Sequence, residues 1–522
     1  MIFFQPVFFG FFAIFFPLYG LLRNRLARQN ALILLGSYIF YGWWDVRFLI
    51  LITISTVVDY ICGLVISGDR FGAAVWRAPL ALLAAVLAGI AVFAPVSLIL
   101  IASLTALGMA LLAVVLALTK EMPHDRRRRL FLGLSILTNL GILATFKYFD
   151  FFAGEFAQMA SAVGWEVNAL TLNLILPVGI SFYTFQTMSY TIDIYRKDFR
   201  PTREFLQFAA FVSFFPQLVA GPIERARNLL PQFAEPRQIT ADRLRSGALL
   251  FMWGFYKKVV IADNVAPVSD RIFSDPTAVS TGELLAGALA FTIQIYCDFS
   301  GYSDMARGLA RMLGFELMVN FRMPYFSRTP SEFWQRWHIS LSSWLRDYLY
   351  ITLGGNRGGA FLTYRNLSLT MLLGGLWHGA AWTFIAWGAF HGAILVVYRI
   401  GDVDNRLSAM AGALRMLAML TAGVVMFVLT VIGWVFFRAA SFTDAAHMLA
   451  HMWMPVWSEN YATVFFYAAP LVIIETFMRL TGRQNPWERM PGIVVFNLCL
   501  FVLFSVLFLD VSTGQDFIYF DF

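Results

Sequence analysis

The sequence has little charge for its length. Only 14% of its 522 residues are charged and 59% are hydrophobic, whereas soluble domains have about 25% and about 45–50%. A soluble fold of this size would need more charge to cover its surface, so a soluble protein is excluded. Cysteine is also scarce, because Cys62, Cys297 and Cys499 are the only three and lie far apart. We expect no disulfide framework and no zinc site, and predict that these residues pack as small apolar side chains.

Long stretches of the chain contain no Asp, Glu, Lys or Arg. Two of them run from Pro79 to Thr119 and from Leu367 to Tyr398. A helix needs about 20 mostly apolar residues to cross a bilayer, so each stretch can hold up to two crossings. We therefore predict an all-α integral membrane protein with about 11–14 transmembrane helices.

The basic residues gather in short segments between apolar runs. Arg23, Arg25 and Arg28 follow the first run, and KEMPHDRRRR (Lys120 to Arg129) follows the first uncharged stretch. This is the pattern of the positive-inside rule, and it accounts for the net charge of +7 without a nucleic-acid partner. The first run, MIFFQPVFFGFFAIFFPLYG, has no basic start and no cleavage site. It is predicted to be a retained span with the N-terminus outside.

Residues 1–522 are predicted to form one membrane domain. Gly and Pro interrupt several apolar runs, notably around Pro216–Pro222 and Gly374–Gly379. Broken backbone at membrane depth is tolerated inside protein or beside a water-filled cavity, so we expect re-entrant or broken segments around an interior chamber. Residues 79–119 are rich in Ala, Leu and Val and have basic segments on both sides. They are predicted to form a peripheral two-helix insertion that crosses the membrane an even number of times.

His378 is the strongest candidate for a catalytic residue. It lies in GGLWHGAAWTF (Gly374 to Phe384), inside an uncharged run and next to Gly379. Glycines let a substrate or another backbone approach closely, and an imidazole buried at low dielectric is neutral and can accept a proton. The pattern indicates a general base that acts on a hydroxyl. The alternative is a histidine packed in the core.

The other histidines are weaker candidates. If one helix runs from His378 to His391, the two residues lie about 19 Å apart along its axis, so His391 is expected to be structural. His338 lies in a Trp- and Arg-rich stretch that is expected to anchor at the membrane interface. If that stretch re-enters the membrane, His338 can meet His378. His447 and His451 have helical spacing and no third ligand nearby, which favours a helix surface.

A polar cluster lies at the end of another apolar run. Asp298, Ser300 and Asp304 are part of YCDFSGYSDMARG. No metal is expected, because the carboxylates do not have metal-ligand spacing. The aspartates are instead expected to pair with Arg307 or Arg311.

Several ordered sequence blocks extend over nearly the whole chain outside residues 70–125. They are YGWWDVRFL (Tyr41 to Leu49), LPVGISFYTFQTMSYTIDIYR (Leu176 to Arg196), FFPQLVAGPIERA (Phe214 to Ala226), GFYKKVVIADN (Gly254 to Asn264), CDFSGYSDMARGLARMLGF, FWQRWHISLSSWLRDYLYITLGGNR, GGLWHGAAWTF and FIYFDF (Phe517 to Phe522). In these blocks the chain resembles the membrane-bound O-acyltransferase family, and within it the alginate O-acetyltransferase branch of bacterial polysaccharide acetylases.

The resemblance implies a fold in which helices ring a central tunnel. The histidine of the family's WHG motif falls on His378, which is then catalytic and lies near the constriction. The second family histidine, in RWHISL, falls on His338. An acyl donor would approach from the cytoplasm and an acceptor from outside. The 79–119 insertion departs from the family pattern, which affects the periphery and partner contacts.

The resemblance also implies the reaction. A multi-pass protein of the bacterial inner (cytoplasmic) membrane would move acetyl, with acetyl-CoA as donor and no tightly bound cofactor, toward hydroxyls of an exopolysaccharide such as alginate. The chain has no soluble esterase domain, so a separate periplasmic acetyltransferase of the serine-esterase type is the expected partner. The other expected partners are the lipid bilayer and the polysaccharide acceptor.

A glycine-rich segment is the candidate for donor binding. LGGNRGG (Leu353 to Gly359) offers backbone N–H groups and the Arg357 guanidinium to a phosphate-bearing donor, with an ordinary connecting loop as the alternative. The other candidates for substrate binding are Asn356, Asp298, Ser300, Trp377 and Trp337.

Other functions remain open from the sequence. Within the same enzyme class the alternatives are D-alanyl transfer to teichoic acid, with an aminoacyl carrier protein as donor, and acetyl transfer to peptidoglycan. A solute transporter or channel would need ionisable residues along a pathway and usually inverted repeats, and neither is apparent. A haem protein with His338 and His378 as axial ligands would be coloured.

Overall fold

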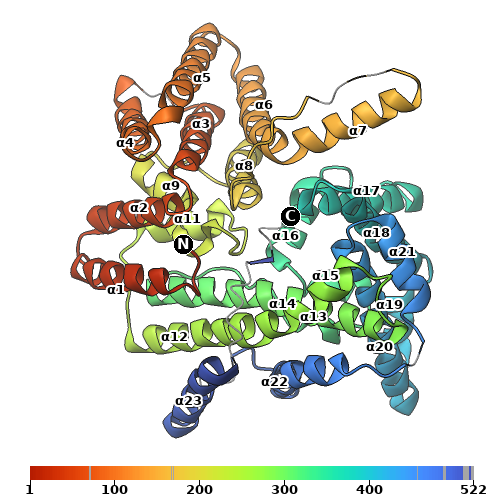
Figure 1. Cartoon of the computed structure of the whole chain (residues 1–522). Coiled ribbons are helices and arrows are strands. Elements are labelled where there is room, and N and C mark those ends of the chain that lie inside the picture. The colour runs from red at the N-terminus through yellow and green to blue at the C-terminus, as the bar shows by residue number, and fades with distance from the viewer. Residues whose placement is uncertain are drawn as a thin grey trace. The chain divides into compact units, whose positions relative to one another are not determined.

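The structure, a computed structural model, describes residues 1–69, 72–165, 167, 170–454, 456–485, 490–509 and 517–518. These residues form helices joined by turns and short irregular segments, and they contain no β-strand (Figure 1). The predicted all-α class is therefore confirmed. The chain divides into two compact units, one of Met1–Arg243 with Ala310–Leu317 and one of Leu244–Leu309 with Met318–Phe522.

The helices of the first unit are short to medium in length. They are α1 (Pro6–Leu21), α2 (Leu26–Gly42), η1 (Val46–Phe48), α3 (Leu49–Ser67), η2 (Ala73–Trp76), α4 (Arg77–Phe93), η3 (Pro95–Ser97), α5 (Leu98–Leu118), α6 (His124–Leu143), η4 (Ala144–Tyr148), α7 (Phe149–Ala162), α8 (Ile180–Arg196), α9 (Phe205–Val212), α10 (Phe215–Leu218) and α11 (Ala226–Ala234).

The second unit holds most of α12 and α14 and all the later elements. They are α12 (Ala241–Tyr256), η5 (Lys257–Ala262), α13 (Asp263–Ser274), α14 (Thr281–Met312), η6 (Pro324–Phe326), α15 (Pro330–Trp334), α16 (Ile339–Trp344), η7 (Leu345–Tyr350), α17 (Ala360–His378), α18 (Trp382–Ile400), α19 (Val403–Ala409), α20 (Gly412–Arg438), α21 (Phe442–His451), α22 (Asn460–Thr481) and α23 (Gly492–Leu509).

Nine helical stretches in the described residues are long and apolar enough to cross a membrane. They are Val46–Ser67, Ala73–Phe93, Pro95–Leu118, His124–Ala162, Thr281–Met312, Trp382–Ile400, Gly412–Arg438, Asn460–Thr481 and Gly492–Leu509. Pro6–Leu21 and Phe205–Leu218 are shorter apolar stretches. A multi-pass membrane protein is therefore confirmed. The expected 11–14 crossings stay a prediction, because length and composition do not count broken or re-entrant segments.

The 79–119 segment forms two helices, α4 and α5, with a break at Ala94. In α4 the buried residues Pro79, Leu83, Val86 and Ile90 repeat at helical spacing, so one narrow face packs inward. Most side chains of α5 are exposed. Exposed apolar side chains on a long helix suit contact with lipid acyl chains, as a peripheral insertion requires.

A buried polar cluster around Asp59 connects α3, α6 and α8 in the first unit. The Asp59 carboxylate accepts hydrogen bonds from Ser135 Oγ at 2.6 Å and Asn139 Nδ2 at 2.8 Å. Asn139 Oδ1 in turn accepts from Ser55 Oγ at 2.7 Å and Thr187 Oγ1 at 3.1 Å. Removing a buried carboxylate from its hydrogen bonds costs free energy, so the cluster fixes these helices together.

Glycines bring α12 and α14 close together in the second unit. A Cβ atom added at Gly301 would lie 2.7 Å from the carbonyl oxygen of Gly254, and one at Gly308 would lie 2.6 Å from that of Gly247. Small residues at such positions let the backbones of membrane helices approach.

Glycines also let α17 and α18 pack closely. A Cβ atom at Gly375 would lie 2.2 Å from the carbonyl oxygen of Phe384, and one at Gly388 would lie 2.4 Å from that of Met371. Gly375, two residues before the WHG motif, therefore lets the backbone of α18 approach α17 closely.

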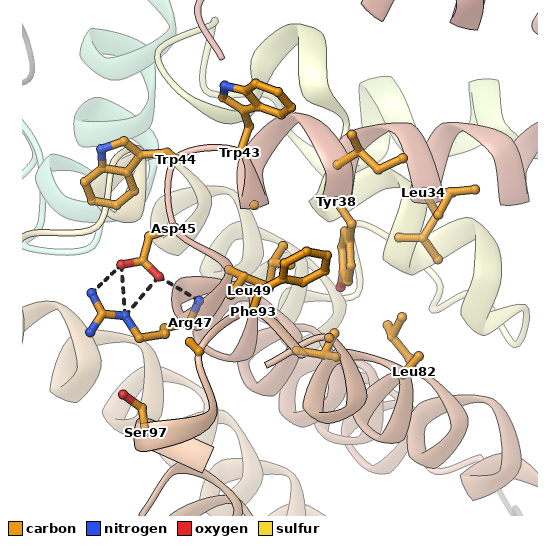
Figure 2. Close-up of a pocket in the computed structure, with 18 of the residues that line it drawn as sticks. Leu34, Tyr38, Trp43, Trp44, Asp45, Arg47, Leu49, Leu82, Phe93 and Ser97 are labelled. Atoms are coloured by element: carbon orange, nitrogen blue, oxygen red, sulfur yellow. Dashed lines mark hydrogen bonds and ion pairs between the residues drawn. The ribbon is translucent and has the colours of Figure 1, made fainter. Parts of the chain in front are cut away.

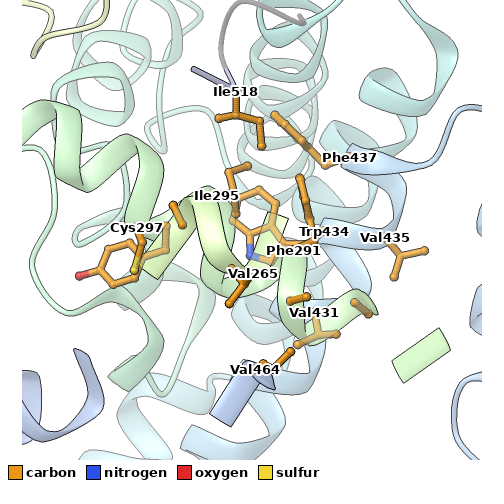
Figure 3. Close-up of a cluster of buried hydrophobic side chains, with 14 of the residues drawn as sticks. Val265, Phe291, Ile295, Cys297, Val431, Trp434, Val435, Phe437, Val464 and Ile518 are labelled. Atoms are coloured by element: carbon orange, nitrogen blue, oxygen red, sulfur yellow. The ribbon is translucent and has the colours of Figure 1, made fainter. Parts of the chain in front are cut away.

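The second unit has a core of buried aromatic and aliphatic side chains (Figure 3). The Trp434 ring lies 6.5 Å from that of Phe291 and 5.5 Å from that of Phe437. Ile295 and Val431 belong to the same cluster. The site described next lies against this core, because Phe437 also contacts one of its histidines.

Candidate active site

His338 has a backbone conformation that is uncommon for a residue with a side chain. Its φ of 42° and ψ of 53° lie in the left-handed region, directly before α16. The Ile339 N–H donates to the carbonyl oxygen of Asn320 at 2.9 Å and helps to set this turn. Residues other than glycine are held in this region only where the surroundings impose it, which occurs often at functional sites.

Asn320 orients the His338 ring. Its Oδ1 lies 3.2 Å from Nδ1 of His338 and accepts from Ser340 Oγ at 2.9 Å. Its Oδ1 also accepts from the backbone N–H of Ser340 at 3.2 Å, which fixes the direction of the amide, and its Nδ2 donates to Ser303 Oγ at 3.2 Å. An acceptor at Nδ1 assigns the proton of the neutral imidazole to Nδ1 and the lone pair to Nε2.

The His338 ring is fully buried. Burial lowers the pKa of His338 to about 3, so the imidazole is neutral at physiological pH. Protein surrounds the ring on all sides, and the interfacial position expected for this residue stays a prediction.

His378 is the last residue of α17, which ends there because Gly379 is extended, with φ −158° and ψ 151°. The ring is buried among aromatic side chains. Its centroid lies 5.0 Å from that of Trp377, 5.1 Å from that of Trp387 and 5.2 Å from that of Phe437. These rings enclose the imidazole on several sides.

The rings of His338 and His378 lie 6.3 Å apart, with 64° between their planes. Trp377 is next to both, at 6.0 Å from His338 and 5.0 Å from His378. The expected meeting of the two histidines is therefore observed. Two buried imidazoles at this separation can remove a proton from a hydroxyl and hold a reacting group.

His391 lies closer to His378 than one continuous helix would allow. The chain turns at Gly379, so the two histidines belong to α17 and α18. Both contact Trp387, at 5.1 Å from His378 and 4.7 Å from His391. The predicted 19 Å separation is wrong, because its condition of a single helix does not hold. His391 also stacks on Phe333 at 5.9 Å, which is an aromatic packing contact.

The Trp-rich stretch before η7 is buried. Trp337 and Trp344 are 1% and 6% exposed, so the predicted interface anchor is wrong for both. The Trp337 ring packs 5.7 Å from that of Phe333 and 4.7 Å from that of Trp434. Trp337 therefore belongs to the aromatic core, whereas Trp377 contacts both histidines.

Two buried lysines of η5 contact the polar cluster on α14. Lys258 Nζ lies 3.0 Å from Asp298, and Lys257 donates to Ser300 Oγ at 2.8 Å. The backbone N–H of Ile518 also donates to Asp298, at 2.7 Å. Sequence reasoning missed these lysines, although they lie in the GFYKKVVIADN block.

The expected pairing of the aspartates with arginines holds only in part. Asp304 pairs with Arg307 at 3.0 Å and with Lys257 at 2.7 Å, whereas Asp298 pairs with Lys258. Consecutive helix residues point about 100° apart, so Asp298 and Phe299 face different ways. Asp298 contacts Lys258, whereas the Phe299 ring lies 4.7 Å from that of His338.

Asn356 and Arg357 lie on an exposed glycine-rich loop between η7 and α17. The 19 residues of α17 extend over about 28 Å. Arg357 precedes this helix and His378 ends it, so the structure does not bring Arg357 together with the histidine pair.

His447 and His451 lie on α21, with ring centroids 4.4 Å apart. Within the described part of the chain, no group of three or more His, Cys, Asp or Glu side chains is placed to hold a metal ion.

Residues 196–441 match the model of the membrane-bound O-acyltransferase family. This part of the chain contains His338, His378 and Asn320. The chain belongs to the membrane-bound O-acyltransferase family, and it is an O-acyltransferase. The transporter, channel and haem alternatives find no support in this family.

The chain is similar to several bacterial enzymes. It is 44% identical over 455 residues to the probable alginate O-acetylase AlgI of Azotobacter vinelandii, with 87% of this chain and 78% of that protein covered. It is 43% identical over 455 residues to the probable alginate O-acetylase AlgI of Pseudomonas aeruginosa, with 87% and 75% covered. It is 34% identical over 446 residues to the peptidoglycan O-acetyltransferase of Helicobacter pylori, with 76% and 83% covered.

Proposed function

We propose that the chain is a membrane O-acetyltransferase that moves acetyl from a cytoplasmic donor toward hydroxyl groups of an exopolysaccharide such as alginate. The observation that carries the proposal is the buried pair of His338 and His378, 6.3 Å apart. Similarity to probable alginate O-acetylases over 87% of the chain supports the substrate class.

In this proposal His378 is the general base. It takes the proton of the acceptor hydroxyl while the hydroxyl oxygen attacks the acetyl carbonyl carbon. The C–O bond forms, the C–S bond to the donor breaks, and the proton passes from the imidazole to the leaving thiolate. His338, held by Asn320 at Nδ1, positions a reacting group through its Nε2.

The donor of this reaction is acetyl-CoA, and the protein holds no cofactor tightly. Because α17 extends over about 28 Å, Asn356 and Arg357 would meet the phosphate-bearing end of the donor and not the acetyl group. Trp377 would line the reacting end, since its ring contacts both histidines.

The remaining candidates for substrate binding hold the residues around the two histidines in place. Trp337 packs in the aromatic core next to His338, and Asp298 and Ser300 fix the part of α14 that carries Phe299. In our proposal they shape the pocket without touching the acetyl group.

The proposed setting is the bacterial inner membrane, with residues 1–522 acting as one domain. Acetyl would reach the sugar through a separate periplasmic acetyltransferase of the serine-esterase type. Acetyl transfer to peptidoglycan is the second candidate, because the relative from Helicobacter pylori is similar over 76% of this chain.

Membranes that contain the chain test the proposal directly. They are given acetyl-CoA with a labelled acetyl group, then alginate or peptidoglycan as acceptor, with and without a periplasmic acetyltransferase. Label in alginate supports the proposal, and label in peptidoglycan alone favours the second candidate. A parallel sample is given a D-alanyl carrier protein in place of acetyl-CoA. If only this donor supports transfer, the proposal is wrong.

A further inference from the structure

The first unit contains an open groove of about 1300 Å³ between α2 and the inserted helix α4 (Figure 2). One wall is α2, with Leu34 and Tyr38, and the opposite wall is α4, with Leu82 and Phe93. Pockets for drug-sized ligands have about 300–1,000 Å³, so this groove has room for a larger molecule.

The groove has one polar end. Figure 2 shows Asp45, Arg47 and Ser97 at one side and Leu34 and Leu82 at the other. The polar end is therefore built for a charged or polar group and the rest for hydrocarbon.

The polar end lies where candidate membrane spans begin and end. One span starts at Val46, one ends at Phe93 and one starts at Pro95. Trp43 and Trp44 are 60% and 43% exposed at the same end, and tryptophan is enriched at the membrane–water interface. This end of the groove is therefore level with lipid headgroups.

The length of the groove corresponds to one leaflet. Its lining residues on α4 run from Leu82 to Phe93, about 17 Å along the helix axis. Half of a hydrocarbon core of about 30 Å is about 15 Å. An acyl chain that starts at the polar end would thus fill the groove and end near the bilayer centre.

The charges at the polar end form a neutral pair. Arg47 Nη2 lies 2.5 Å from Asp45 Oδ2, Arg47 Nε donates to Asp45 Oδ1 at 3.0 Å, and the side chains are 41% and 18% exposed. The guanidinium has five N–H donors, so its Nη1 group can bind a phosphate oxygen while the pair stays intact. The carboxylate attracts an ammonium group that can donate hydrogen bonds.

We propose that this groove binds one glycerophospholipid with an ethanolamine headgroup, its phosphate at Arg47, its ammonium at Asp45 and an acyl chain between α2 and α4. A headgroup with both charges fits a neutral pair, whereas an anionic headgroup would be repelled by Asp45. A choline headgroup carries the same charges but has no N–H donor. The groove depends on the inserted helix, because α4 forms the wall opposite α2.

Lipid binding to the full chain tests the proposal. The protein is extracted in mild detergent, stripped of lipid, and offered equimolar phosphatidylethanolamine, phosphatidylcholine and phosphatidylglycerol with identical acyl chains. Native mass spectrometry measures the bound lipid of each class. We expect phosphatidylethanolamine to be bound at least about tenfold better than either competitor, which is about 1.4 kcal/mol.

Two variants address the two ends of the groove. Arg47→Ala removes the phosphate ligand, and Gly89→Phe fills the space between the helices, since Gly89 lines the groove and faces Val46. Each should lower phosphatidylethanolamine binding about tenfold. The matched controls are Arg203→Ala, from the exposed ion pair with Asp69, and Gly108→Phe on α5. Both controls should bind like the wild type.

The proposal is overturned if the three lipids bind equally, if phosphatidylglycerol binds best, or if only one of the two groove variants has an effect. A protein segment that copurifies in the groove and is displaced by Gly89→Phe would also overturn it. If Arg47→Ala does not extract as a monodisperse protein, Arg47→Gln replaces it.

Discussion

The rings of His338 and His378 lie 6.3 Å apart, although one residue precedes α16 and the other ends α17. Two breaks in helical backbone make this possible, the left-handed turn at His338 and the extended residue Gly379. The candidate site is therefore made at helix ends, where a ring can leave the face of its helix and approach a ring from another segment.

Replacing His378 with Ala is expected to lower acetyl transfer by about 10²–10⁴-fold, because a positioned general base contributes that much to the rate. His378→Gln should fail too, since an amide accepts no proton at neutral pH. The rate is measured in membranes and normalised to protein level. His447→Ala on α21 is the histidine control and should keep the wild-type rate. A His378→Ala rate above about a tenth of wild type would contradict the role, and a loss of abundance alone would favour packing.

Asn320→Ala is expected to lower the rate about 10–100-fold, by analogy with the loss of the hydrogen-bond partner of a metal-bound histidine. Asn320→Asp keeps the acceptor for the Nδ1 proton of His338 and should restore most of the rate. Its carboxylate favours the imidazolium and raises the pKa of His338. Activity should then be lost at a higher pH on acidification, because the ring becomes protonated earlier. Equal rates and equal pH profiles for all three proteins would show that Asn320 only packs.

Lys258→Met is expected to destabilise the protein by about 3–5 kcal/mol, because it leaves buried carboxylates without their cation. Asp298→Asn should cost less, since Lys258 keeps Asp263 at 2.7 Å. Thermal unfolding in detergent measures both, and the double variant should recover part of the loss. Arg271→Ala, from the more exposed pair with Glu283, should cost less than about 1 kcal/mol. Strict additivity in the double variant would rule out the coupling.

Deleting residues 79–119 is expected to leave the remaining topology unchanged. The segment forms two helices, α4 and α5, so an even number of crossings is removed. Reporter fusions placed after residue 130 should keep their cytoplasmic readout. An inverted readout would mean that the segment crosses an odd number of times.

Arg357→Ala is expected to raise the apparent KM for the donor with little change in kcat, because the loop lies about 28 Å along α17 from His378. Initial rates at several acetyl-CoA concentrations separate the two parameters. Protein abundance should stay normal, since the side chain is exposed. Arg406→Ala, on another exposed segment, is the control. An unchanged KM would remove Arg357 from donor binding.

The all-α class follows from the sequence, because a long uncharged run in a bilayer satisfies its backbone hydrogen bonds by forming a helix. His378 could also be found from the sequence, since an ionisable residue inside such a run is conspicuous. The role of His338 was harder to predict, because it requires that its stretch re-enter the membrane. A sequence pattern can suggest re-entry but does not give the position of the side chain.

Other parts of the site depend on contacts between distant segments. Asn320 lies in an irregular segment after α14, so no periodicity indicates that its amide meets His338. The pairing of Lys258 with Asp298 joins η5 to α14. The burial of Trp337 was missed because tryptophan is common both at interfaces and in cores. His391 was misplaced because a single turn at Gly379 redirects the next helix.

The left-handed backbone of His338 affects how mutations there can be interpreted. Asparagine tolerates this conformation, whereas alanine does not adopt it readily. An alanine variant would lose the imidazole and also let the turn before α16 relax. Asparagine at this position would keep the turn, so it separates the chemistry of the ring from the shape of the chain.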